Sequence, residues 1–303
     1  MPQLTANGLE FHVQTLGDPG DPPVVLIHGL LTGSVASWYF GLAPALSPDH
    51  RVFLYDQRGH GRSERPPSGY TLAELAADLD ELTVPLGPCA LVGHSYGGVV
   101  ALRHAIDHTP RVTGVVLVDS FVPGGGDGAA PVFADAGTTG RWTGDDRPAD
   151  SDRAREAGRR SRRHRATADE LLLEGTSVLE DVRRDSVLDP VALARLPMPV
   201  LCAVGSDSPF RGDVEALVEL LPAGRRVEVL PGGHALHVDA PGELARAVRE
   251  FLDGLEATGA SGAPGAPGAP LGPLGSLGSL GPGAPLGPGA PLGSSHRNGA
   301  EHG

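Results

Sequence analysis

The fold is decided by the stretch Cys89-Ala-Leu-Val-Gly-His-Ser-Tyr-Gly-Gly-Val-Val100. Its first four residues are a short apolar run with the length of a buried strand. Gly93 to Gly97 then form a Gly-x-Ser-x-Gly turn, and apolar residues recur at helical spacing from Val99 to Ile106. A strand, a sharp turn and a helix in this order hold a serine on strained backbone with its hydroxyl exposed. We therefore predict that Ser95 is a nucleophile.

The glycines and the helix of this stretch support the same interpretation. Side chains at Gly93 and Gly97 would collide with the neighbouring strand and helix, so the tight turn requires glycine at both positions. The helix directs its N-terminus, the positive end of its dipole, at the Ser95 oxygen. Tyr96 is the residue directly after the expected nucleophile, and the loop at Leu30 follows an apolar run that is expected to be a buried strand. We predict that the backbone N–H groups of these two residues form an oxyanion hole.

Composition excludes several classes of function. The chain has 303 residues and a net charge of −13, which argues against general nucleic-acid binding. All 24 basic residues are arginine, so a lysine nucleophile or Schiff base is excluded. Cys89 and Cys202 fall in predicted buried strands and are expected to be small core side chains rather than a disulfide or metal ligands. We expect no metal and no cofactor.

The sequence also bears on location. It shows no charged-then-apolar N-terminal segment and no apolar run long enough to span a membrane. These features favour a cytoplasmic protein with no membrane partner.

Apolar strands alternate with helix-like segments along most of the chain. This alternation predicts a parallel sheet with helices on both faces, which binds ligands at the carboxyl ends of its strands. His28, Ser95 and Asp119 each follow a predicted strand, so we expect them at one edge of the sheet. The expected strands are 9–16, 24–27, 51–55, 89–92, 111–118, 197–204 and 227–230, and the expected helices are 35–46, 71–82, 99–106, 213–221 and 243–255.

Two segments break the alternation. Residues 121–196 are rich in Gly, Asp and Arg, and we expect an inserted helical lid there, between core segments 1–120 and 197–257. The lid contains seven arginines from Arg153 to Arg165. Residues 258–303 are rich in Gly, Pro, Ala and Leu. Such a segment cannot build a core, so we expect a disordered tail.

A serine nucleophile needs a base, and the base needs an acid that fixes its tautomer. Of the 12 histidines, His234 fits best, because it lies on a glycine-flanked loop after the last predicted strand. His237 is a second candidate that we expect to pack or to cap a helix. We expect His94 to point away from Ser95, and His28 to shape the oxyanion loop.

Several motifs together resemble the α/β-hydrolase superfamily over residues 8–255. They are His28-Gly29, Asp56-x-Arg58-Gly59-x-Gly61-x-Ser63, Gly93-His94-Ser95-Tyr96-Gly97-Gly98 and Gly233-His234 followed by Ala240-Pro241. The resemblance implies an α/β-hydrolase fold with a mostly parallel sheet. Within it, the turn at Asp56 and Arg58 is expected to be structural, tied together by charge-assisted hydrogen bonds.

The resemblance leaves two candidates for the acid. In many relatives the acid follows the strand that here ends at Val204, in a Gly-x-x-Asp-Pro pattern. This chain has Gly205-Ser206-Asp207-Ser208-Pro209, so the acid position holds Ser208 and Asp207 comes one residue early. Some relatives, including thioesterases of actinomycete polyketide pathways, place the acid one strand earlier, where this chain has Asp119. We predict Asp119, with Asp207 as the alternative.

The resemblance implies a serine hydrolase that cleaves a small-molecule ester or an acyl-thioester through an acyl-enzyme. Ser95 departs from haloalkane dehalogenases and epoxide hydrolases of this fold, which have Asp as nucleophile. The Arg153–Arg165 cluster could dock an acyl carrier protein or coenzyme A phosphates, which favours a thioesterase releasing a polyketide-type acyl chain. The alternatives are a general carboxylesterase on small esters and a non-hydrolytic member of the fold, such as a lyase, a haloperoxidase-like protein or a ligand receptor.

Overall fold

The computed structural model describes residues 2–31, 33–120, 171–185, 187–221 and 226–257. Residues 121–170 of the expected lid, with its Arg153–Arg165 cluster, lie outside the described residues, as does the expected tail 258–303.

The core is an eight-stranded sheet with the strand order β1-β2-β4-β3-β5-β6-β7-β8. Strands β1 and β2 pair antiparallel, β2 is antiparallel to β4, and all the other neighbours are parallel. The predicted α/β architecture with a mostly parallel sheet is therefore confirmed. The strands are β1 Gln3–Ala6, β2 Leu9–Leu16, β3 Pro23–Ile27, β4 Arg51–Tyr55, β5 Cys89–His94, β6 Val112–Val118, β7 Val200–Gly205 and β8 Arg226–Leu230.

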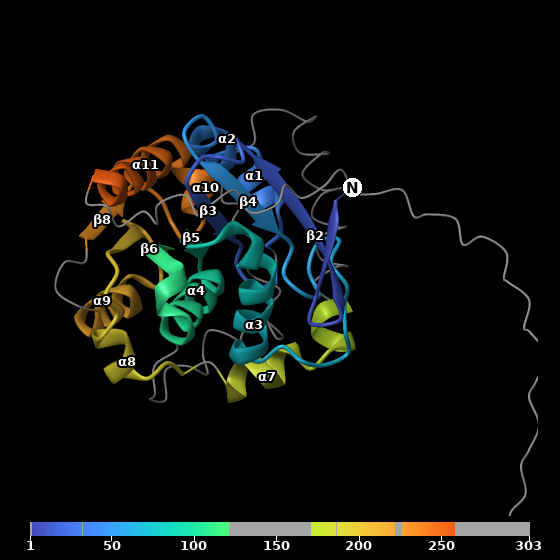
Figure 1. Cartoon of the computed structure of the whole chain (residues 1–303). Helices are drawn as coiled ribbons and strands as arrows, with labels where there is room; N and C mark the ends of the chain where they lie inside the picture. Colours follow the sequence, from blue (N-terminus) through green and yellow to red (C-terminus); the bar gives the residue numbers. More distant parts are fainter. Residues whose placement is uncertain (1, 32, 121–170, 186, 222–225, 258–303) are drawn as a thin grey trace, which may run out of the picture. The chain divides into compact units, whose positions relative to one another are not determined.

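Helices cover both faces of this sheet, as Figure 1 shows for the part of the chain that is described. On one face lie α3 Leu72–Thr83, α4 Tyr96–Asp107, α7 Val178–Arg184, α8 Pro190–Ala194 and α9 Arg211–Leu220. On the other lie α1 Ala36–Tyr39, α2 Leu42–Leu46, α10 Leu236–Asp239 and α11 Pro241–Ala257. Among the described residues, no helix has both the length and the apolar character needed to cross a bilayer.

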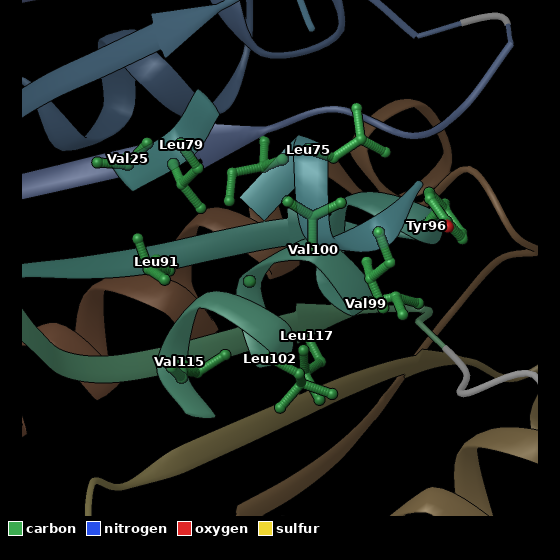
Figure 2. Close-up of a cluster of buried hydrophobic side chains, with 14 of the residues drawn as sticks. Val25, Leu75, Leu79, Leu91, Tyr96, Val99, Val100, Leu102, Val115 and Leu117 are labelled. Atoms are coloured by element: carbon green, nitrogen blue, oxygen red, sulfur yellow. The ribbon is translucent and has the colours of Figure 1, made fainter. Parts of the chain in front are cut away.

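Successive side chains of the central strands pack alternately into two separate hydrophobic cores, one on each face of the sheet. Leu91 of β5 belongs to the core under α3 and α4, whereas its neighbours Ala90 and Val92 belong to the core under α2 and α11. This period of two is the direct consequence of strand geometry. Figure 2 shows Val99 and Val100 of α4 in the first of these cores, on the side of the sheet that carries Leu91.

The two cysteines and the start of helix α3 lie where the sequence predicts them. Cys89 and Cys202 are both buried in the hydrophobic core, as expected for small core side chains. Helix α3 begins after Thr71 with a complete capping box, in which Thr71 and Glu74 satisfy each other's backbone N–H groups. The predicted start of this helix is thus confirmed.

Three expectations were wrong in detail. The segment 35–46, expected as one helix, is two short helices separated at Gly41, and Phe40 between them is 83% exposed. Strand β7 begins at Val200 rather than at 197, because two prolines, which lack a backbone N–H, precede it. Strand β1 was not expected; it pairs with β2 across a turn at Asn7 and Gly8.

The described part of the expected lid packs against the main body. Its residues 171–175 are helical, and α7 and α8 follow. Leu172, Val178, Val182 and Leu193 are buried in the same hydrophobic core as α3 and α4. This part of residues 121–196 therefore belongs to one helical face of the sheet.

Candidate active site

Ser95 occupies the sharp turn that the sequence predicts. It lies between β5 and α4 with φ 52° and ψ −124°, a backbone conformation that non-glycine residues rarely adopt. A Cβ at Gly93 would lie 2.4 Å from the carbonyl oxygen of Gly97, and a Cβ at Gly97 would lie 2.4 Å from that of His28. The glycines are therefore required, as expected, because strand, turn and helix approach too closely for any side chain.

Strained backbone is concentrated at this edge of the sheet. Among the described residues, four non-glycine residues have positive φ: Asn7, Leu31, Ser95 and Asp119. Asn7 belongs to the β1–β2 turn, whereas the other three lie after β3, β5 and β6, where their strands end. Strain of this kind persists only where the surrounding structure holds it, and it is common at functional sites.

The strand order brings the predicted base to the predicted acid. Asp119 follows β6 and His234 follows β8, so the loop carrying His234 has to cross the end of β7. Gly205, the last residue of β7, makes this crossing possible. A Cβ there would lie 2.3 Å from the carbonyl oxygen of Gly233, so the loop rests directly on the strand end.

Asp119 is the carboxylate that contacts His234. Its side chain is fully buried, and Nδ1 of His234 lies 2.6 Å from its Oδ2. Oδ2 also accepts a hydrogen bond from the Ser208 hydroxyl at 2.6 Å, and Oδ1 accepts one from the Gly205 N–H at 3.0 Å. A buried carboxylate is expected to have such donors, because an unpaired buried charge is costly.

Asp207, the alternative acid, lies elsewhere. Its side chain is exposed, and its Oδ2 accepts a hydrogen bond of 3.3 Å from the Ser206 hydroxyl. Its backbone N–H donates to the carbonyl oxygen of Gly232 at 2.9 Å. The geometry therefore favours Asp119 over Asp207 as the partner of His234.

The expected triad also requires a hydrogen bond between Ser95 and His234, and the structure does not show it. Among the described residues, the Ser95 hydroxyl makes no hydrogen bond, so the structure joins His234 to Asp119 but not Ser95 to His234. Ligand-free sites often show long or poorly aligned catalytic hydrogen bonds that tighten when substrate binds.

Two buried imidazoles brace the loop of the expected oxyanion hole. His28 accepts a hydrogen bond at Nε2 from the Gln57 N–H (2.9 Å), and His60 accepts one at Nε2 from the Leu31 N–H (3.0 Å). Burial lowers the pKa of both side chains, that of His60 to about 3, so both are neutral near pH 7 and can act as acceptors. The Leu31 N–H is thereby occupied, whereas the Leu30 N–H meets no acceptor among the described residues.

His94 and His237 pack beside His234, directly or through each other. Nε2 of His94 donates to the carbonyl oxygen of His234 at 2.8 Å, and the two rings lie 4.8 Å apart. Burial lowers the pKa of His94 well below its usual value, and the neighbouring imidazoles lower it further. The His237 ring contacts the rings of His94 and Trp38. We interpret both as supports of the His234 loop, a role the sequence analysis did not assign to His94.

Asp56 and Arg58 hold the turn after β4 by charge-assisted hydrogen bonds, as expected. Arg58 pairs with Asp78 of α3 through two hydrogen bonds of 2.6 Å, rather than with Asp56. Asp56 accepts from the backbone N–H groups of Val35 (2.6 Å) and Arg62 (2.9 Å). The structural role of the turn follows the prediction, but its ion pair joins the turn to α3.

One group of described side chains could in principle hold a metal ion. It consists of Asp80, His104 and His108, whose ligand atoms lie within 4.8 Å of one another. The Arg111 guanidinium already contacts Asp80 Oδ1 at 2.5 Å. The group lies at the opposite end of α4 from Ser95, so it takes no part in the site described above.

Comparison with known proteins adds a family to this geometry. The model of the alpha/beta hydrolase family matches residues 24–247. The chain is 41% identical over 118 residues to RutD of Variovorax paradoxus (strain S110), a proposed carbamate hydrolase. That match covers 37% of this chain and 43% of the relative, so the two are similar over less than half of the relative's length.

Solved structures share the architecture at low sequence identity. The enol-lactonase from Burkholderia xenovorans LB400 matches with a TM-score of 0.65 and 22% identity, over 83% of this chain and 100% of that one. The thioesterase domain from the curacin biosynthetic pathway matches with a TM-score of 0.61 and 22% identity, over 82% and 98%. At such identities the likeness shows the fold alone.

Proposed function

The chain belongs to the alpha/beta hydrolase family and is a hydrolase of that fold, and from this premise we propose that it cleaves esters or thioesters through an acyl-enzyme on Ser95. The observation that carries the proposal is the 2.6 Å contact between His234 Nδ1 and the buried Asp119 carboxylate, at the sheet edge where Ser95 follows β5. A histidine held in this way presents Nε2 as a base.

In the first half-reaction, His234 Nε2 takes the proton of the Ser95 hydroxyl while Oγ attacks the carbonyl carbon of the substrate. Negative charge develops on the carbonyl oxygen, where the Leu30 and Tyr96 N–H groups stabilise it. The tetrahedral intermediate collapses, and His234 gives its proton to the departing alcohol or thiol. The acyl group is then bonded to Ser95 Oγ.

In the second half-reaction, water takes the place of the leaving group. His234 removes a proton from the water as the water oxygen attacks the acyl carbon, and the same two N–H groups stabilise the oxyanion. Collapse of this intermediate breaks the bond to Ser95 Oγ, which regains its proton from His234. Asp119 keeps the correct tautomer of His234 and stabilises the imidazolium in both halves.

The more specific proposal concerns the acyl donor. An acid after β6 and the arginine-rich segment 153–165 favour a thioesterase that releases a polyketide-type chain from an acidic carrier protein. The second candidate is a general carboxylesterase on small esters. The identities to the relatives above support the fold and a hydrolytic reaction, and do not separate these two substrate classes.

The proposal is tested with a fluorophosphonate probe and a hydrolysis assay. We expect the probe to label the native chain, and we expect Ser95→Ala to abolish labelling and to lower kcat by a factor on the order of 10⁶. Labelling that survives Ser95→Ala would contradict a nucleophilic role for this residue. Absence of both labelling and hydrolysis in the native chain would favour a receptor or another non-hydrolytic role.

The substrate class is tested by comparing an acyl-carrier thioester with a p-nitrophenyl ester. For a carrier-dependent thioesterase, exchanging Arg159 and Arg163 for Gln lowers kcat/KM on the carrier thioester and leaves the simple ester unaffected. The matched control exchanges Arg246 and Arg249 of α11 for Gln. A preference for the simple ester that the first exchange leaves unaltered contradicts the thioesterase proposal and favours the carboxylesterase.

A further inference from the structure

We propose that Ser208 is a positioning residue that fixes the Asp119 carboxylate for His234. The inference rests on the proposed function, because it assigns a role within the same triad. Ser208 does not touch the reacting atoms. It acts through Asp119 and takes no part in the proton transfers of the proposed reaction.

The geometry of the Ser208 hydroxyl carries the proposal. Ser208 is only 8% exposed, and its Oγ lies 2.6 Å from Asp119 Oδ2. The same Oγ accepts a hydrogen bond from the Phe210 N–H at 3.1 Å. Since a hydroxyl has a single proton and that proton points to the carboxylate, the Phe210 N–H fills an acceptor position of Oγ and sets the direction of its O–H bond.

The carboxylate is thus held by both of its oxygens. The Gly205 N–H donates to Oδ1 and the Ser208 hydroxyl to Oδ2; Gly205 is the last residue of β7, and Ser208 belongs to the turn that follows it. Two donors on different oxygens oppose rotation of the carboxylate about its last torsion. With Ser208 removed, one anchor remains, and the orientation of Oδ2 toward His234 Nδ1 is less well defined.

The Ser208 hydroxyl also reduces the negative charge that the Asp119 carboxylate presents to His234. His234 Nδ1 and Ser208 Oγ donate to the same oxygen, each at 2.6 Å. A hydrogen bond to a charged acceptor spreads part of its charge toward the donor. Removal of the hydroxyl leaves more negative charge facing the imidazole ring and favours its protonated form.

The turn after β7 also contacts His234, the partner of Asp119. The Phe210 ring packs edge-on against the His234 ring, with centroids 4.7 Å apart. Two titratable side chains of the described residues face His234: Asp119, which follows β6, and His94 of β5. Residues 205–210 therefore hold the carboxylate through Gly205 and Ser208, and contact the imidazole through Phe210.

The test is Ser208→Ala, assayed with the ester that the native chain hydrolyses. We expect kcat to fall about 10-fold with KM unchanged, since a hydrogen bond to a charged group is lost. We also expect the acidic limb of the kcat/KM profile to move to higher pH by roughly half a unit, because the protonated base is favoured. Ser208→Thr, which keeps the hydroxyl, is expected to restore both quantities toward native values.

The matched control is Ser206→Ala. It removes an exposed hydroxyl from the same turn, one that contacts Asp207 rather than Asp119. A thermal melt of each variant confirms that it is folded. If Ser208→Ala does not fold, Ser208→Cys carries the test, because its thiol fills the site but is only a weak hydrogen-bond donor. A fall in kcat with no shift of the acidic limb overturns the positioning role, because a merely structural defect lowers activity at every pH alike.

Failure of this inference is distinguishable from failure of the proposed function. If Ser208→Ala keeps the native rate and pH profile while Ser95→Ala is inactive, the acyl-enzyme proposal stands and the role of Ser208 is wrong. If Ser95→Ala also keeps the native rate, the proposed function itself is wrong, and the positioning role falls with it.

Discussion

The ends of β6 and β7 offer the clearest comparison in this molecule. The two strands are parallel neighbours, and each is followed closely by an aspartate, Asp119 after β6 and Asp207 after β7. Asp119 is fully buried and bonded to His234, whereas Asp207 is exposed and bonded to Ser206. Two aspartates at the same edge of one sheet therefore have different environments, and only the environment of Asp119 suits the acid of the proposed triad.

The difference arises in the backbone. Asp119 has φ 46°, and its N–H donates to the carbonyl oxygen of Ala203 at 2.7 Å. This conformation turns its side chain toward β7, where the Gly205 N–H and the Ser208 hydroxyl meet it. In the turn after β7 the buried position belongs to Ser208, and Asp207, one residue earlier, points to solvent. The buried, donor-rich position therefore distinguishes the two aspartates.

The largest expected effect comes from Asp119→Asn. The amide keeps the size of the carboxylate but offers an N–H where His234 donates its own, so the wrong tautomer of the imidazole is favoured. We expect kcat to fall by a factor on the order of 10⁴. Steady-state kinetics with a simple ester, beside a thermal melt that shows the variant to be folded, provide the measurement. A rate within 10-fold of native would mean that Asp119 is not the acid.

A smaller change in kcat is expected when the carboxylate is transferred from residue 119 to residue 208, in the turn after β7. Ser208 Oγ lies 2.6 Å from Asp119 Oδ2, so a carboxylate on residue 208 reaches the space near His234 Nδ1. We expect Ser208→Asp, added to Asp119→Asn, to raise kcat about 10-fold above Asp119→Asn alone, because a hydrogen-bonded charge returns to the imidazole.

The same double variant tests whether the buried position of residue 208 matters, or whether any nearby negative charge suffices. Added to Asp119→Asn, the control substitution Ser206→Asp places a carboxylate on the exposed part of the same turn and is expected to recover nothing. Equal recovery from both substitutions would show that a general negative charge suffices and that the buried position has no special role. No recovery from Ser208→Asp would show that residue 208 cannot take the place of the acid.

Much of this site could be predicted from the sequence, because local patterns carry it. Gly93 to Gly97 specify the turn at Ser95 by steric necessity, and the alternation of strands and helices specifies which edge Ser95, Asp119 and His234 share. The choice between Asp119 and Asp207 could not be made in this way. It depends on a positive φ at Asp119 and on a loop that crosses β7 over Gly205, and both are properties of packing between strands distant in sequence.

Other misses have different causes. The sequence does contain a signal for β1, since Asn7-Gly8 is a strong hairpin turn and both residues have positive φ. The break between α1 and α2 at Gly41 was hidden by the apolar residues on either side of it. The role of Ser208 had no sequence signal of its own, because a serine at the expected acid position indicates only that the acid is missing there.

The smallest expected effect is that of Asp207→Asn. The side chain is exposed, and its contact is a 3.3 Å hydrogen bond from the exposed Ser206, so removing its charge disturbs neither the base nor the core. We expect kcat/KM within about 2-fold of native and a free energy of unfolding within about 0.5 kcal/mol, as for other surface substitutions. The measurement is the kinetic assay used for Asp119→Asn, with both variants prepared in parallel. A loss as large as that of Asp119→Asn would mean that the turn after β7 rearranges when substrate binds and that the exposed aspartate supplies the acid. The comparison of the two strand ends would then be reversed, because burial in the ligand-free protein would no longer identify the catalytic carboxylate.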